Sequence, residues 1–280
     1  MILLKEVFRR LRQSRRWVAA QFLVTALLIA IGIAWTRLPE KHFWQVALSL
    51  LLPLLLGLSA IELQAGTMRG FAADDGKRIK LIWGAVSLLV WIALAALAWW
   101  LLDWCDDQIP EWAGYLNSKA PAHARAKLLT YEHIYLWITY AEWVLRWIVV
   151  PAKVIPGAMA SAQWGYRLPW RGVFRLLLNW RWWSGVIVAA LIGVLLPSEF
   201  FAGEPHGSVS AQVWSVSLKL AAAYLFAIGS WVLLLGWCAV LLDRRKQSPP
   251  EKELAEIPAL VGPPEPEKRA SVKLPLPEAE

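Results

Sequence analysis

The chain has 280 residues, of which 58% are hydrophobic and 20 are tryptophan. This composition, together with a positive mean hydropathy, excludes an ordinary soluble globular protein and a disordered chain. The net charge of +8 does not indicate nucleic-acid binding, because no folded basic domain can be recognised outside the apolar segments. The sequence therefore predicts an all-α, polytopic integral membrane protein.

Six stretches are apolar over about 20 residues, the length that crosses a hydrocarbon core of about 30 Å. A basic amphipathic segment, 1–16, precedes the first. The predicted spans cover about 17–35, 43–63, 81–102, 134–152, 182–201 and 213–242. In the fifth, the charge-free core "SGVIVAALIGVLLP" has 14 residues, which fits either a re-entrant segment or a span extended by its aromatic ends.

The basic residues lie mostly on one side of the predicted spans. Four segments on one side hold 22 of the 29 Lys and Arg residues, against 5 in the loops on the other side. Basic loops stay in the cytoplasm, so the pattern predicts a cytoplasmic N-terminus and C-terminus. We interpret the chain as a multi-pass protein of a bacterial inner membrane.

Two similar segments precede the first and fifth spans. "VFRRLRQSRRW" (7–17) and "VFRLLLNWRWW" (173–183) agree at six positions. Arg and Trp favour the interface between lipid and water. The expected interfacial anchors are Arg15, Arg16, Trp17, Arg181, Trp182 and Trp183. The ranges 5–69 and 171–245 share the order basic segment, span, loop, span. This order fits a parallel internal repeat, or two unrelated hairpins that look alike because both cross a membrane.

The loop predicted at 103–133 gathers polar side chains. Its Asp, Cys, Glu and His residues are of the types that bind metals, at Asp103, Cys105, Asp106, Asp107, His123, Glu132 and His133. No fixed ligand spacing supports a metal site, so we predict no metal and no cofactor. The catalytic motifs G-x-S-x-G, H-E-x-x-H and C-x-x-C are absent from the sequence, and no catalytic residue is assigned.

The fourth predicted span contains an acid and a base four residues apart, Glu142 and Arg146. An ionised side chain costs about 2.5–3.5 kcal/mol at the bilayer centre, and an i,i+4 partner offsets that cost. The expected intramembrane polar stripe is Tyr135, Thr139, Glu142, Arg146 and Lys153. The stripe either lines a path for a solute, or Glu142 and Arg146 neutralise each other and only stabilise the bundle. Lys219 in the last span can extend toward the headgroups or meet an acid.

The last segment, 243–280, is rich in proline and charge and has no helical period, which predicts a disordered cytoplasmic tail. Three functions remain open. The first is a non-enzymatic membrane component that binds lipids through its basic surface or protein partners through the tail. The second is a small-solute or ion transporter that uses the polar stripe, and the third is a membrane-embedded hydrolase.

Overall fold

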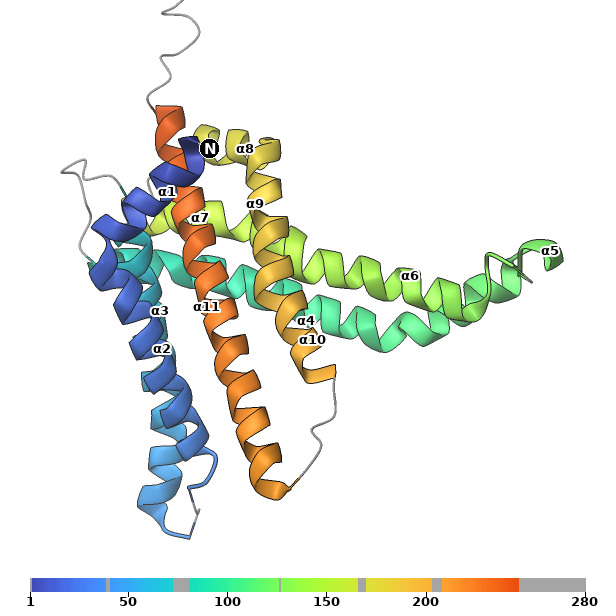
Figure 1. Ribbon diagram of the computed structural model, residues 1–280, viewed down its shortest axis with the longest axis horizontal. Coiled ribbons are helices and arrows are strands. Elements are labelled where there is room, and N and C mark those ends of the chain that lie inside the picture. Colours follow the sequence, from blue (N-terminus) through green and yellow to red (C-terminus); the bar gives the residue numbers. More distant parts are fainter. Residues whose placement is uncertain are drawn as a thin grey trace, which may run out of the picture. The chain divides into compact units, whose positions relative to one another are not determined.

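The computed structural model describes residues 2–38, 41–72, 81–125, 127–165, 170–202 and 208–246. Every regular element within these ranges is a helix (Figure 1). Six helical segments are long and apolar enough to cross a membrane: Arg15–Trp35, Phe43–Gly70, Trp83–Lys119, Tyr131–Trp164, Trp180–Ala202 and Val209–Asp243. The chain is therefore an all-α polytopic membrane protein, and the prediction of six spans is confirmed. The tail predicted to be disordered lies outside the described residues from residue 247 onward.

The N-terminal part is a short amphipathic helix followed by a helical hairpin: α1 (Ile2–Gln13), α2 (Arg15–Trp35) and α3 (Phe43–Gly70). Helices α2 and α3 pack along their length. Trp35 Nε1 donates to the Ser49 carbonyl (3.1 Å) at one end, and Thr67 Oγ1 donates to Gln21 Oε1 (2.9 Å) toward the other. Polar pairing of this kind satisfies side chains that lipid cannot solvate.

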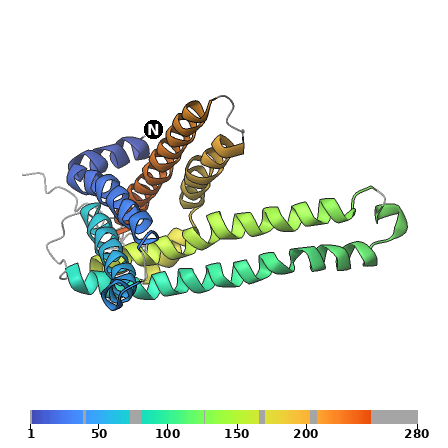
Figure 2. The ribbon, with the colours of Figure 1, turned by 90° about the horizontal axis from the view of Figure 1, so that it is seen from below.

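The middle of the chain forms a long hairpin, in which α4 (Leu81–Lys119) pairs with α6 (Tyr131–Val144), a π-helical turn η1 (Leu145–Val149) and α7 (Val150–Trp164). Figures 1 and 2 both show the two arms side by side. Hydrogen bonds fix the register of the two antiparallel arms. Ser87 Oγ donates to the Ser161 carbonyl near one end, and Asn117 Nδ2 donates to the Leu129 carbonyl near the tip.

The loop expected at 103–133 is largely helical. Helix α4 continues to Lys119, and the short helix α5 (Ala122–Arg125) precedes the start of α6. The polar segment stays helical because its apolar side is covered, with Ile109, Ala113 and Ile134 buried. At about 1.5 Å per residue, the 39 residues of α4 measure about 58 Å, nearly twice the thickness of a hydrocarbon core.

Helix α7 lies at the centre of the packing. Small residues occupy much of it, and Ala152, Ala158, Ala160 and Ala162 are buried. They allow close approach: the Trp91 ring of α4 lies directly over Gly157, and Trp91 Nε1 donates to Ser161 Oγ (2.7 Å). Association of helices in lipid depends on such contacts, because burial of apolar surface gains little when the solvent is also apolar.

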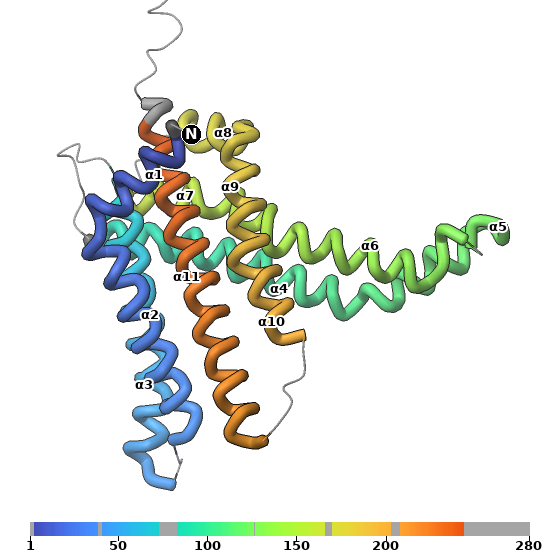
Figure 3. Tube along the Cα trace, in the orientation of Figure 1, coloured from blue at the N-terminus to red at the C-terminus, as the bar shows by residue number. Residues whose placement is uncertain are grey.

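The C-terminal part repeats the order of the N-terminal part. A short amphipathic helix α8 (Trp170–Leu177) leads into α9 (Trp180–Ala190), a second π-helical turn η2 (Leu191–Leu195) and α10 (Leu196–Ala202), followed by α11 (Val209–Lys246). The trace from α9 through η2 to α10 is one continuous helix (Figure 3). Its 23 residues measure about 34 Å, so the fifth apolar segment is long enough to span.

Both hairpins have an indole ring packed over glycine, with the order of the two helices exchanged. Trp17 of α2 packs over Gly66 and Gly70 of α3, whereas Trp237 of α11 packs over Gly185 of α9. The shared order of elements agrees with a parallel repeat but does not show common ancestry, so the repeat stays a prediction.

The packing of α4 on α7 predicts opposite effects for two helical glycines. A Cβ at Gly157 would overlap the Trp91 ring, whereas a Cβ at Gly114 meets nothing within 4 Å. We expect Gly157→Ala to destabilise the fold by about 1–3 kcal/mol through overpacking, while Gly114→Ala is neutral or stabilising by up to about 1 kcal/mol. Reversible unfolding in detergent micelles measures both. Equal stability of the two variants would contradict the α4–α7 contact.

Candidate functional site

A cluster of three charged side chains joins the two arms of the long hairpin. Arg146 in η1 donates from Nε to Glu142, one turn earlier, and its NH1 group lies 2.7 Å from Asp103 Oδ1 of α4. The side chains of Arg146 and Glu142 are 19% and 13% exposed, while that of Asp103 is 63% exposed. The guanidinium is thus compensated by two carboxylates, and only one of them is on its own helix.

Two tryptophans lie beside this cluster. The rings of Trp99 and Trp147 meet edge to face with centroids 5.0 Å apart, and Arg146 Cζ lies 5.7 Å from the centroid of the Trp99 ring. A cation over an indole face gains roughly 0.5–2 kcal/mol. The ring pair therefore adds to the charge compensation of Arg146 and covers one side of it.

The other residues of the expected polar stripe do not join this cluster. Tyr135 stacks on Tyr131 and is 38% exposed. Thr139 Oγ1 is buried without a hydrogen-bond partner among the described residues. Lys153 lies with its Nζ 5.9 Å from the Trp183 ring centroid. The π-helical turn inserts one residue, which rotates the following positions by about 100°, so the regular spacing assumed for Lys153 does not hold. Lys219 is half-buried on α11.

A second ion pair, which sequence reasoning missed, fastens α1 to the bundle. Arg10 NH1 lies 2.5 Å from Asp243 Oδ2 near the end of α11 and also donates to the Phe71 carbonyl (3.0 Å) after α3. Ser14 Oγ donates to the Gly70 carbonyl. We call this end of the bundle, where Arg10, Gly70 and Asp243 meet, the basic end. The pair joins residues 233 positions apart, so no local pattern could have indicated it.

Helix α1 has one face on the bundle and one face exposed. Val7 is 2% exposed and packs against Gly236; with Arg10 and Ser14 it forms the bundle face. The exposed cations form a basic stripe: Lys5, Arg9 and Arg12 follow the helical spacing i, i+4, i+7 on α1, and Arg16 follows in the first turn of α2. Leu4 and Phe8 are 52% and 56% exposed beside it. This combination of exposed cations and apolar side chains is typical of a helix lying at a membrane surface.

The expected interfacial anchors take three different positions. Arg15, Arg16 and Arg181 are exposed. Trp17 packs over Gly66 and Gly70, and Trp183 Nε1 donates to the Leu177 carbonyl. Trp182 departs from the expectation: it is fully buried, and its Nε1 donates to the Ala152 carbonyl of α7 (3.0 Å). Adjacent helical positions point about 100° apart, so Trp182 faces the bundle while Arg181 does not.

Two apolar cavities border α9 and α11. One, of about 220 Å³, also contacts α1 through Leu4 and Val7. The other, of about 470 Å³, is bordered by Trp99, by Trp147 of η1 and by Gly193 of η2. Neither is lined by Glu142 or Arg146. Both π-helical turns of the described chain thus border the larger cavity, and such turns are frequent at functional sites.

No protein-family model, curated protein or solved structure matches the chain. Within the described ranges, no three His, Cys, Asp or Glu side chains are grouped so that they could hold a metal ion.

The charge cluster predicts unequal effects for its members. Arg146→Met leaves two carboxylates without their cation and should cost on the order of 3–5 kcal/mol. Glu142→Gln leaves Arg146 paired with Asp103, so we expect a loss of only about 1–2 kcal/mol. The double change should recover most of the Arg146→Met loss, since Asp103 is largely exposed. Unfolding free energies in detergent test this order; a Glu142→Gln loss as large as that of Arg146→Met would contradict it.

The ion pair at the basic end predicts a contrast between neighbouring arginines. Arg10→Met removes the partner of Asp243, whose side chain is 9% exposed, and should destabilise the protein by about 3 kcal/mol. The matched change Arg9→Met affects a side chain that is 67% exposed and should stay within about 0.5 kcal/mol of the wild type. Protection of the α1 amides from hydrogen exchange should fall only in Arg10→Met. If α1 remains protected, the pair does not hold it on the bundle.

Proposed function

We propose that the protein is a non-enzymatic, multi-pass component of a bacterial inner membrane that binds anionic lipids through the exposed face of α1. The observation that carries the proposal is the orientation of this helix. Val7, Arg10 and Ser14 hold one side against α3 and α11, so the basic stripe faces outward in a fixed direction. A preorganised cationic surface binds with less loss of conformational entropy than a disordered basic segment does.

The chemistry of this face matches the region where headgroups and acyl chains meet. Leu4 and Phe8 can enter the upper acyl region, while Lys5, Arg9, Arg12 and Arg16 lie beside them for phosphate groups. Each Lys or Arg close to an anionic leaflet contributes about 1 kcal/mol. After the turn at Ser14 the chain enters α2, the first candidate span, so α1 is tied directly to a membrane-spanning helix.

The helix ends that meet at the basic end support a single lipid-facing side. Arg10 and Asp243 are in contact, and Gly70 lies beside Ser14, so the end of α1, the end of α3 and the end of α11 meet at the basic end. Anionic lipids and Lys- and Arg-rich loops share the cytoplasmic side of a membrane. We propose on this basis that the basic end faces the cytoplasm, the side that the charge distribution of the sequence predicts for both termini.

The transport hypothesis receives less support from the site. Arg146 is compensated by Glu142 and Asp103, and neither described cavity is lined by Arg146 or Glu142. A solute path needs polar groups exposed toward a cavity. Binding of protein partners through the tail concerns residues outside the described ranges and stays a prediction.

The proposal predicts a change in lipid selectivity when the basic stripe is neutralised. In mixed bilayers, electron paramagnetic resonance of spin-labelled lipids gives the relative association of phosphatidylglycerol and phosphatidylcholine with the whole protein. We expect the wild type to prefer phosphatidylglycerol by about threefold, and the triple change Arg9→Gln, Arg12→Gln, Arg16→Gln to reduce this preference to near unity.

A control removes as many charges elsewhere. Arg37, Lys119 and Lys127 are exposed cations away from the basic end, and their replacement by Gln should leave most of the preference in place. Equal selectivity of the wild type and the α1 variant, or an equal loss in the control, would contradict a role for α1.

A further inference from the structure

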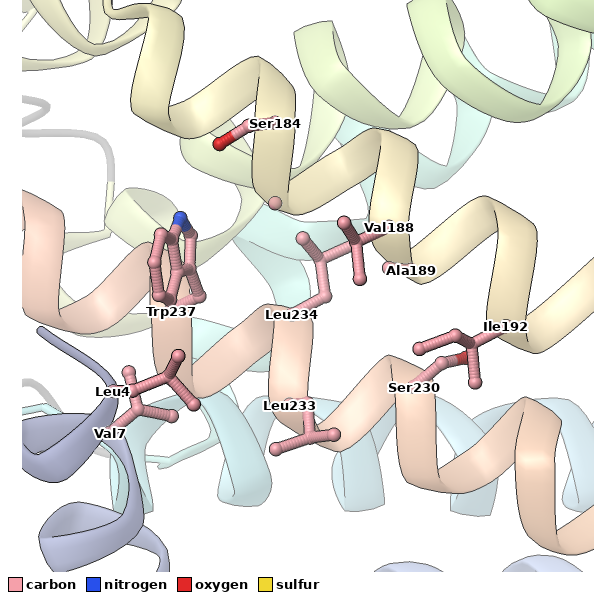
Figure 4. Close-up of a pocket in the computed structure, with 11 residues that line it drawn as sticks. Leu4, Val7, Ser184, Val188, Ala189, Ile192, Ser230, Leu233, Leu234 and Trp237 are labelled. Carbon is pink, nitrogen blue, oxygen red and sulfur yellow. The ribbon is translucent and has the colours of Figure 1, made fainter. Parts of the chain in front are cut away.

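The smaller cavity lies between α9 and α11 next to α1. Figure 4 shows Val188 and Ala189 of α9 and Ile192 of η2 facing Leu233 and Leu234 of α11, with Leu4 and Val7 at one side. The cavity measures about 220 Å³. Helices α9 and α11 both belong to candidate membrane spans, and α1, which borders the cavity through Leu4 and Val7, precedes another.

The few polar atoms in its wall are already bonded within the protein. Ser184 Oγ donates to the Arg181 carbonyl (3.0 Å), Ser230 Oγ donates to the Ala227 carbonyl (2.9 Å) and Trp237 Nε1 donates to the Arg181 carbonyl (3.0 Å). An ordered water needs two to four polar partners, and these donors are already committed to carbonyls. The cavity therefore suits hydrocarbon rather than water.

A cation lies on the same helical stripe as the cavity. Arg181, Ser184 and Val188 follow the spacing i, i+3, i+7 within α9, which places them on one face of this helix. Arg181 is exposed in the first turn of the fifth candidate span. It makes no ion pair with any residue that the structure describes.

The distances along α9 match the layout of a phospholipid. From Arg181, the lining residues Ser184 to Ile192 extend roughly 5–17 Å along the helix axis at about 1.5 Å per residue. A cation at the level of the headgroups is thus followed by an apolar cavity at the level of the upper acyl chain.

We propose that this cavity holds one acyl chain of an anionic phospholipid whose phosphate binds Arg181. The inference rests on the proposed lipid binding, but it concerns a single retained molecule at α9 and α11 instead of the surface contact at α1. Both sites lie near the basic end, so the occupant belongs to the leaflet on that side.

Native mass spectrometry of the full chain in detergent, with dioleoyl phosphatidylglycerol or dioleoyl phosphatidylcholine added, tests this site. We expect one retained phosphatidylglycerol and at least fivefold less retained phosphatidylcholine. Val188→Trp fills the cavity and should reduce retention of phosphatidylglycerol at least fivefold. The matched control Ile187→Trp changes a neighbouring exposed residue that lines neither cavity and should retain the lipid.

Arg181→Gln separates the headgroup contact from packing, because it leaves the cavity unchanged. It should lower retention of phosphatidylglycerol to the level of phosphatidylcholine. Retention by Val188→Trp at the wild-type level, equal loss in Ile187→Trp, or retention unaffected by Arg181→Gln would each overturn the proposal. The triple variant of α1 should still retain the single lipid while it loses the bulk selectivity for phosphatidylglycerol, which would show that the two sites act separately. If Val188→Trp loses the single lipid but keeps the bulk selectivity, surface binding at α1 still stands.

Discussion

The close approach of α7 to its neighbours is the contact on which most of the bundle depends. In lipid, burial of apolar surface contributes little to the association of helices. Helices therefore need small residues, which allow close dispersion contacts, and hydrogen-bond donors that satisfy polar atoms of neighbouring helices. Helix α7 offers small residues and hydrogen-bond acceptors. The Trp91 ring packs on Gly157 and its N–H donates to Ser161, while the N–H of Trp182 donates to the Ala152 carbonyl. One helix made largely of small side chains thereby joins α4 and α9.

Tryptophan serves here as an interhelical donor as much as an interfacial residue. Indole N–H groups cross from one helix to another at several places: Trp35 to Ser49, Trp91 to Ser161, Trp182 to Ala152, Trp231 to Gln64 and Trp237 to Arg181. An indole combines a large apolar ring with one donor, so it fills space and satisfies an acceptor at once. The abundance of tryptophan in this chain therefore has two physical causes, only one of which is the aromatic belt at the membrane interface.

The two ion-pair clusters lie at different positions and have different consequences. The pair Arg10–Asp243 joins the first and last described helices and directs the basic stripe of α1 outward. The cluster of Arg146 joins α4 to η1 beside two tryptophans. In both clusters the charges compensate one another. Among the exposed cations of α1, Arg9 lies 3.8 Å from Glu6, whereas Lys5 and Arg12, like Arg181 of α9, make no ion pair with a residue that the structure describes. This difference favours lipid binding over solute transport for the function we propose.

The sequence by itself determined the features that depend on local spacing: six apolar helices, the amphipathic segments before α2 and α9, and the i,i+4 geometry that brings Glu142 to Arg146. Regular spacing holds only while the helix stays α-helical, so the π-helical turn at η1 displaced Lys153 from the expected stripe. Tertiary structure alone decided that Asp103 is the second partner of Arg146, that Arg10 meets Asp243 and that Trp182 is buried. These outcomes depend on which helices pack together, because side chains distant in sequence meet only through that packing, and the cavity between α9 and α11 exists for the same reason.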